Sequence, residues 1–237
     1  MNPGLNRRSV FGLSLLDTAV FSVAIIVLIK RWYPDFYSNL YEVNLKLAAF
    51  LSLIFLLGPV INVLIYKPQR DKYVNDLSVL YILKLVVLGV GLHLAYTQRP
   101  VLVAFSVDRL VVVQAHQTEM GRIPPEIMKL MISSEAPPLI AARELPKDDL
   151  SLIFEVMSGG VDIEYRPAHY ERFKHQRERF YHRMCNSEID VKDFGVNFDR
   201  NCGSIAVPLV YDTDEFAIAV FDSEHETIRR VIFQDPW

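Results

Sequence analysis

Two charged residues lie inside long apolar stretches, where an ionisable side chain is costly and normally has a protein partner. Asp17 belongs to the apolar residues 10–29, and Lys84 belongs to the apolar residues 77–96. In helices rising about 1.5 Å per residue, both lie about 10 Å from the start of their stretches, so they could form an ion pair. Asn62, in a third apolar stretch, could join them.

Three interpretations of this polar set remain open. The pair could be an internal salt bridge that orients the helices, or Lys84 could receive a carboxylate from a partner protein. Each side chain could also extend to the membrane surface without a partner. These interpretations make Lys84, Asp17 and Asn62 the candidate binding residues.

Other chemistry has weak support in the sequence. It contains no GxGxxG, P-loop, HExxH, GxSxG or CxxC motif, which leaves catalysis without a recognisable signature. His169, His175 and His182 are six and seven residues apart, so they lack the i, i+4 spacing of a zinc helix. The net charge of -3 does not indicate the excess of positive charge that is typical of nucleic-acid-binding proteins. We therefore expect no enzyme activity, metal, cofactor or nucleic-acid partner.

The two cysteines, Cys185 and Cys202, are candidates for a disulfide. Such a bond would close a loop of about 16 residues and stabilise the fold by about 3 kcal/mol in the entropy model. It requires an oxidising compartment, which the predicted orientation below provides. Two unreactive thiols are the alternative.

Three stretches of twenty residues, 10–29, 47–66 and 77–96, each match one hydrocarbon thickness as a helix. We therefore predict three transmembrane helices in a membrane unit, residues 1–96, with lipid as a partner. Gly58 and Pro59 interrupt the second helix, as membrane helices tolerate. Gly58, Gly89 and Gly91 would allow another helix to approach closely, or would only serve packing among the three.

Basic residues near the ends of the spans give a small bias in orientation. The side of the amino terminus has five basic residues, Arg7, Arg8, Lys67, Arg70 and Lys72. The opposite side has four, Lys30, Arg31, Lys46 and Arg99. This bias predicts a cytoplasmic amino terminus and an outer location for everything after residue 96.

Residues 97–237 have the patterns of an α+β domain large enough to bury its own core. We predict strands near 101–114, 204–211, 215–222 and 227–233, and helices near 124–131, 147–160 and 168–184. Asp108 and Arg109 interrupt the first strand, which predicts a bulge or sharp bend there. This pair could brace the membrane helices against the outer domain, or it could be an exposed pair of little energy.

The chain resembles the type IV pilin accessory proteins of the TfpX/TfpZ type, encoded beside major pilins in many Gram-negative bacteria. The resemblance rests on the order of LGPVINVLIYKP, DLSVLYILKL, GVGLHLAYTQRPVLVAFSVDRLVVV, APPLIAARELP, SGGVDIEYRPAHYE and VPLV...AIAVFD...VIFQDPW. The family usually has a glycine before the last strand, where this chain has DSEHE, and an uncharged polar residue near Lys84. The terminal Trp237 could anchor the tail to the domain or lie against the membrane surface.

The resemblance implies a non-enzymatic inner-membrane protein with a periplasmic domain. Such a protein binds and stabilises the major pilin, or modulates pilus assembly and retraction, in contact with the assembly machinery. Mature pilins carry a glutamate near the start of their membrane helix, which in the inserted pilin lies in the same inner leaflet as Lys84. Two alternatives remain: an envelope sensor whose periplasmic domain binds a small ligand, and a purely structural subunit of the pilus machine. Against the sensor, the loop between the second and third spans is too short for an output domain.

Overall fold

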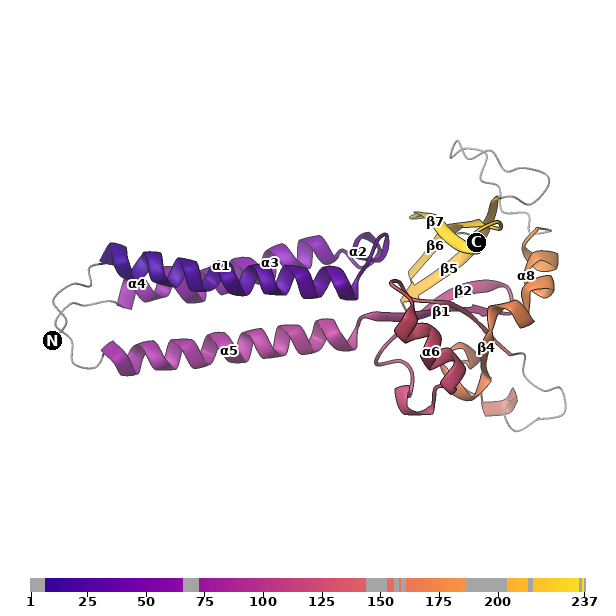
Figure 1. Cartoon of the computed structure of the whole chain (residues 1–237), viewed down its shortest axis with the longest axis horizontal. Helices are drawn as coiled ribbons and strands as arrows, with labels where there is room; N and C mark the ends of the chain where they lie inside the picture. The colour runs from indigo at the N-terminus through magenta and orange to yellow at the C-terminus, as the bar shows by residue number, and fades with distance from the viewer. Residues whose placement is uncertain are drawn as a thin grey trace. The chain divides into compact units, whose positions relative to one another are not determined.

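We describe the chain from a computed structural model. It describes residues 7–65, 73–143, 153–155, 158, 161–185, 204–212, 215–234 and 236. The chain divides into two compact units, Met1–Thr97 and Gln98–Trp237 (Figure 1). The division falls one residue after the boundary predicted from the sequence.

The first unit is helical. Its elements are α1 (Arg7–Trp32), α2 (Tyr37–Leu40), α3 (Val43–Phe55), the π-helix η1 (Leu56–Val60), α4 (Ile61–Ile65) and α5 (Tyr73–Thr97). Three helical stretches are long and apolar enough to cross a membrane, namely Arg8–Trp32, Val43–Ile65 and Asp76–Thr97. The prediction of three long apolar helices near the amino terminus is therefore confirmed.

Aromatic side chains connect α1 and α5 at one end of this helical unit. The rings of Trp32 and Tyr96 meet edge to face, with their centroids 5.4 Å apart. The Tyr33 hydroxyl donates a 2.9 Å hydrogen bond to the carbonyl of Ala95. These contacts hold the end of α1 to the end of α5. Complete burial raises the pKa of the Tyr37 hydroxyl, in α2, far above its ordinary value.

The second unit contains a mixed seven-stranded sheet in the order β4-β3-β1-β2-β5-β6-β7. Its strands are β1 (Pro100–Ser106), β2 (Arg109–Gln114), β3 (Leu139–Ala142), β4 (Tyr170–Arg172), β5 (Ser204–Asp212), β6 (Glu215–Asp222) and β7 (Thr227–Ile232). The pairs β1–β3 and β2–β5 are parallel, and the other neighbours are antiparallel. The predicted strands 204–211, 215–222 and 227–233 are confirmed.

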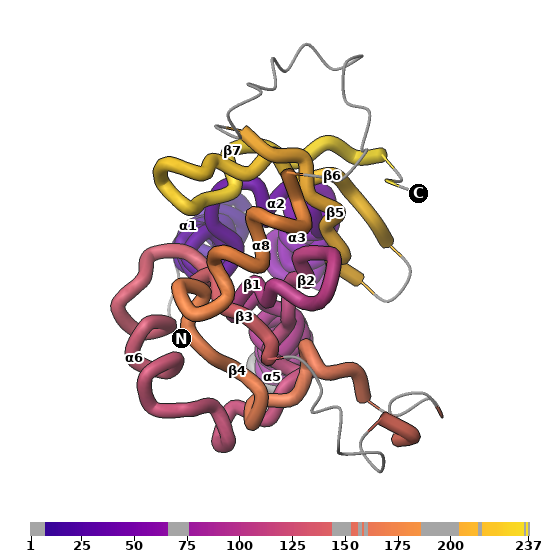
Figure 2. Tube along the Cα trace, turned by 90° about the vertical axis from the view of Figure 1, so that its right-hand side faces the viewer, coloured from indigo at the N-terminus to yellow at the C-terminus, as the bar shows by residue number. Residues whose placement is uncertain are grey.

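Two helices and their neighbouring segments complete the core of this unit. The helix α6 (Pro125–Ser133) contributes the fully buried Ile127 to a cluster with Leu102 and Ile140 of the sheet. The helix α8 (Arg177–Met184) lies over the strands (Figure 2). Its buried Phe180 packs edge to face against Phe105 of β1 and Phe221 of β6.

Two predicted elements differ from the structure. Asp108 marks a two-residue turn that reverses the chain between β1 and β2, so residues 101–114 form a hairpin and not one bent strand. The predicted helix 168–184 begins only at Arg177. The preceding Tyr170–Arg172 is extended because it pairs with β3, a contact distant in sequence. Of the predicted helix 147–160, Ile153–Glu155 is helical, and most of the remainder lies outside the described residues.

Candidate functional site

An ion pair lies within the helical unit. The Lys84 ammonium is 2.5 Å from Oδ2 of Asp17 and donates a second hydrogen bond, of 3.3 Å, to the Thr18 hydroxyl. It also lies 5.0 Å from the centre of the Phe21 ring, within range of a cation–π interaction. The Lys84 side chain is 5 % exposed, whereas that of Asp17 is 39 % exposed. The cation is thus enclosed, and the anion remains partly open.

The space for the ammonium group depends on Gly58. A Cβ at this position would lie 2.6 Å from the Thr18 hydroxyl oxygen and 3.7 Å from the Lys84 nitrogen. Pro59 has no N–H to donate to the preceding turn, and the helix widens into η1 at this point. The glycine therefore lets α1 approach the second span closely beside the ion pair.

The other predicted glycines have different surroundings. A side chain at Gly91 would overlap the ring of Phe50, so this glycine serves packing inside the helical unit. Gly89 has open space, with nothing within 4 Å of a Cβ built there. Gly58 and Gly91 thus match the interpretation of local packing, and Gly89 leaves the approach of another helix open.

Asn62 contacts α1 one helical turn away from the ion pair. Its Nδ2 donates a 2.8 Å hydrogen bond to the hydroxyl of Ser14, four residues before Thr18. Its Oδ1 is buried and has no hydrogen-bond partner among the described residues. The structure therefore brings Asp17 and Lys84 together directly, while Asn62 joins the same side of α1 through Ser14.

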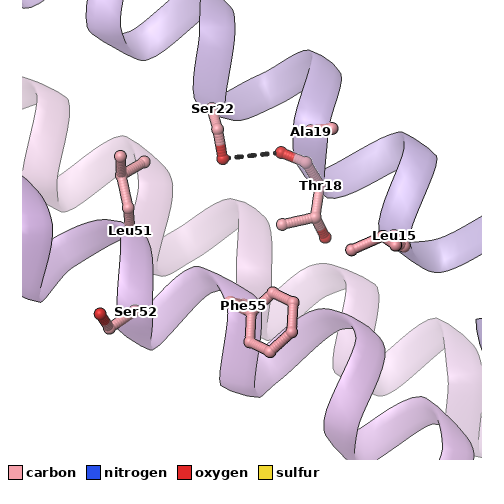
Figure 3. Close-up of a pocket in the computed structure, with 7 residues that line it drawn as sticks. All are labelled: Leu15, Thr18, Ala19, Ser22, Leu51, Ser52 and Phe55. Carbon is pink, nitrogen blue, oxygen red and sulfur yellow. Dashed lines mark hydrogen bonds between the residues drawn. The ribbon is translucent and has the colours of Figure 1, made fainter.

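A groove of about 380 Å³ between α1 and α3 was not apparent from the sequence. Its lining residues are Leu15, Thr18, Ala19, Ser22, Leu51, Ser52 and Phe55 (Figure 3). The Ser22 hydroxyl donates to the Thr18 carbonyl, and the Ser52 hydroxyl donates to the Ala48 carbonyl, each at 2.8 Å. Because these donors are used within their own helices, the groove suits hydrocarbon. The spacing of Thr18 and Ser22 by four residues was the available sequence signal.

In the sheet unit, Asp108 and Arg109 form an ion pair with each other at the turn between β1 and β2. The Arg109 Nε lies 3.0 Å from the Asp108 carboxylate, and both side chains are substantially exposed. Exposed pairs of this kind contribute little stability. This geometry favours the interpretation of an exposed pair over that of a brace.

Cys185, at the end of α8, is disulfide-bonded. The other cysteine of the chain, Cys202, lies outside the described residues, as does Trp237. The pairing of Cys185 with Cys202 and the role of Trp237 therefore stay predictions.

Glu164 is a half-buried carboxyl that sequence reasoning did not single out. Burial raises its pKa, although a 3.1 Å hydrogen bond from the Ser106 hydroxyl opposes this effect. The nearby Tyr170 hydroxyl donates to the Glu164 carbonyl at 2.8 Å, and burial raises the pKa of this tyrosine to about 12. The Tyr170 hydroxyl therefore stays protonated at neutral pH and can donate this hydrogen bond.

The turn between β6 and β7 is built around a nearly buried carboxylate. Burial alone would raise the pKa of Asp222, but hydrogen bonds from the His225 ring and two backbone amides lower it. The Arg229 guanidinium lies 2.6 Å from the same carboxylate. Glu226 closes the turn with a φ of 51°, and its carboxylate is 2.8 Å from Arg177.

Among the described residues, no group of three or more His, Cys, Asp or Glu side chains could hold a metal ion. Comparisons of the chain with protein-family profiles, with curated proteins and with solved structures find no match. The resemblance to the pilin accessory proteins therefore rests on the sequence motifs alone.

Proposed function

We propose that this chain is a non-enzymatic inner-membrane accessory protein that binds and stabilises a major type IV pilin, or modulates its assembly and retraction. The observation that carries the proposal is the Asp17–Lys84 ion pair inside three apolar helices. Charged side chains inside the hydrocarbon layer of a membrane normally contact protein groups and not lipid. The resemblance of the motifs supplies the pilin as the partner.

The packing of α5 supports a role in binding other membrane helices. Among residues 76–97, Lys84 is the sole buried residue, so polar contacts position this part of the helix more than apolar packing does. Most of the apolar surface of the spans is left for lipid or for another helix. An unassembled pilin offers a long apolar helix and a globular head. A protein with both a helical unit and a sheet unit has a surface for each.

The proposed location has the amino terminus in the cytoplasm and the sheet unit in the periplasm. The three candidate spans and the small excess of basic residues on the amino-terminal side support this arrangement. A disulfide at Cys185 is compatible with an oxidising compartment. A reporter enzyme fused after residue 237 tests the location, because a cytoplasmic reporter signal would contradict it.

Pilin abundance and co-purification test the function. Removing both charges in a Lys84→Leu, Asp17→Leu variant avoids leaving one charge buried alone, and we expect it to lower pilin levels and pilin recovery on the tagged protein. Lys46→Leu is the matched control, because Lys46 is exposed near the start of α3. The amount of each variant in the membrane must equal that of the unmodified protein. The proposal would be overturned if the double variant left pilin levels unchanged and the unmodified protein did not co-purify with pilin.

A further inference from the structure

One side of the ion pair is incomplete within the chain. Lys84 occupies Oδ2 of Asp17, and no described residue donates a hydrogen bond to Oδ1. The side chain of Asp17 is also 39 % exposed, although it lies about 10 Å into an apolar helix. Hydrocarbon offers no hydrogen-bond donor, so an exposed carboxylate oxygen at this depth is costly unless another molecule supplies one.

The residues around this carboxylate form a continuous helix face. Leu13, Asp17, Val20 and Ala24 follow one another at spacings of four, three and four residues, which places them along one side of α1. Leu13 and Val20 are 62 % and 63 % exposed, and Ala24 is also exposed. We call these four residues the Asp17 face. The small side chain of Ala24 allows a second helix to come close.

We infer that the Asp17 face docks a transmembrane helix of another protein, and that this helix carries a positive charge or a hydrogen-bond donor at the depth of Asp17. The inference rests on the proposed membrane location, and a pilin helix would satisfy it only by facing Asp17 with a donor and not with its own glutamate. It differs from direct binding of a client carboxylate by Lys84, because that ammonium is enclosed and already holds Asp17.

Charge argues against the two other occupants of this face. In a symmetric pair of copies, each Asp17 face would meet itself and bring two carboxylates together, which is unfavourable. Lipid tails have no donor, and the positively charged or hydroxyl groups of lipids remain at the surface. A helix from a different protein can place its donor at the required depth.

Model peptides test the inference without requiring the pilin. The full-length protein is reconstituted in phosphatidylcholine vesicles with apolar peptides of about 20 residues, long enough to span the bilayer. One peptide carries a single Lys at the depth of Asp17, one a single Gln, and one only Leu. We expect the Lys and Gln peptides to bind about tenfold more tightly than the Leu peptide, the effect of one interhelical hydrogen bond.

A charge-free variant and a second helix face provide the controls. The Asp17→Leu, Lys84→Leu variant should bind all three peptides equally, provided that its helix content and elution volume are unchanged. A photocrosslinker at Val20 should capture the Lys peptide, whereas one at Val86 of α5 should not. Val86 is 55 % exposed and lies at a similar depth, so lipid exposure alone would give equal capture.

The outcomes separate this inference from the proposed function. Equal binding of all three peptides by the unmodified protein, or equal capture at both positions, would overturn the docking face. So would a crosslinked product made of two copies of this chain. Selective binding of the Lys and Gln peptides by a protein that does not affect pilin levels would uphold the face and reject the pilin as client. Co-purification of pilin by a protein that binds all three peptides equally would reject the docking face and support the pilin as client.

Discussion

The third apolar helix and the first strand follow one another in the chain, yet they bury opposite kinds of residue. In α5, the sole buried residue among 76–97 is the charged Lys84. In β1, which begins three residues after α5 ends, all seven residues are buried and six of them are apolar. Polar contacts at Lys84 therefore help to position α5, whereas apolar packing holds β1.

This contrast follows from the solvent expected around each unit. In water, burying apolar side chains such as Val103 and Phe105 drives folding. In lipid, apolar side chains gain little by leaving a hydrocarbon surrounding, so polar pairs and close contacts between small residues decide which helices meet.

The largest effect is expected in the sheet unit. Phe180→Ala removes a ring that contacts Phe105 and Phe221, and should lower the unfolding free energy by about 4 kcal/mol. Thermal melting of the detergent-solubilised chain, followed by circular dichroism in the β region, measures this change. Phe233→Ala, at an exposed ring, is the control and should change stability by less than about 0.5 kcal/mol. Similar losses for both variants would contradict apolar packing as the source of stability.

In the helical unit, the corresponding large loss should come from removing one charge. Asp17→Leu leaves the enclosed Lys84 without its anion and should destabilise the helices by about 3 kcal/mol. Adding Lys84→Leu should recover most of that loss, because the uncompensated charge is then removed. Denaturation of the full chain by dodecyl sulfate measures all three proteins. If the double variant were no more stable than Asp17→Leu alone, the pair would not be a coupled unit.

Adding a single methyl group at Gly58 or at Gly89 tests whether close helix contact stabilises the helical unit. Gly58→Ala forces a shift of the nearly buried Thr18 and should destabilise the helices by about 2 kcal/mol. Gly89→Ala has room, and should be neutral or stabilise by up to about 1 kcal/mol through helix propensity. The same denaturation assay compares the two variants. Equal effects would show that close helix contact at Gly58 does not matter.

Patterns that are local in sequence were the ones that could be predicted. A run of apolar residues as long as the hydrocarbon is thick identified the three long helices, and short runs of strand-forming residues bounded by turn residues identified β5 to β7. Counting residues from the span ends placed Asp17 and Lys84 at equal depths, and the structure brings them together. Depth carries over from sequence to structure because a helix has a fixed rise per residue.

Features that depend on distant partners could not be predicted. Tyr170–Arg172 is a strand because β3 lies beside it, and β3 itself is only four residues long. The groove beside Thr18 depends on how α1 and α3 approach each other. The unequal exposure of Asp17 and Lys84 likewise follows from helix packing and not from their equal depth. This inequality moved the expected client contact from the lysine to the aspartate.

The smallest effect is expected at the turn before β7. Glu226 has a φ of 51°, a conformation in which glycine is favoured over residues with a Cβ. Glu226→Gly and Glu226→Ala both remove the contact with Arg177, so their difference isolates the backbone preference. We expect the glycine variant to be more stable than the alanine variant by about 1 kcal/mol in thermal melting of the sheet unit. At Glu224, in the same turn and without a positive φ, the order should reverse, because glycine there only adds freedom to the unfolded chain. A glycine variant at 226 that melts below the alanine variant would mean that the positive φ does not favour glycine at this position.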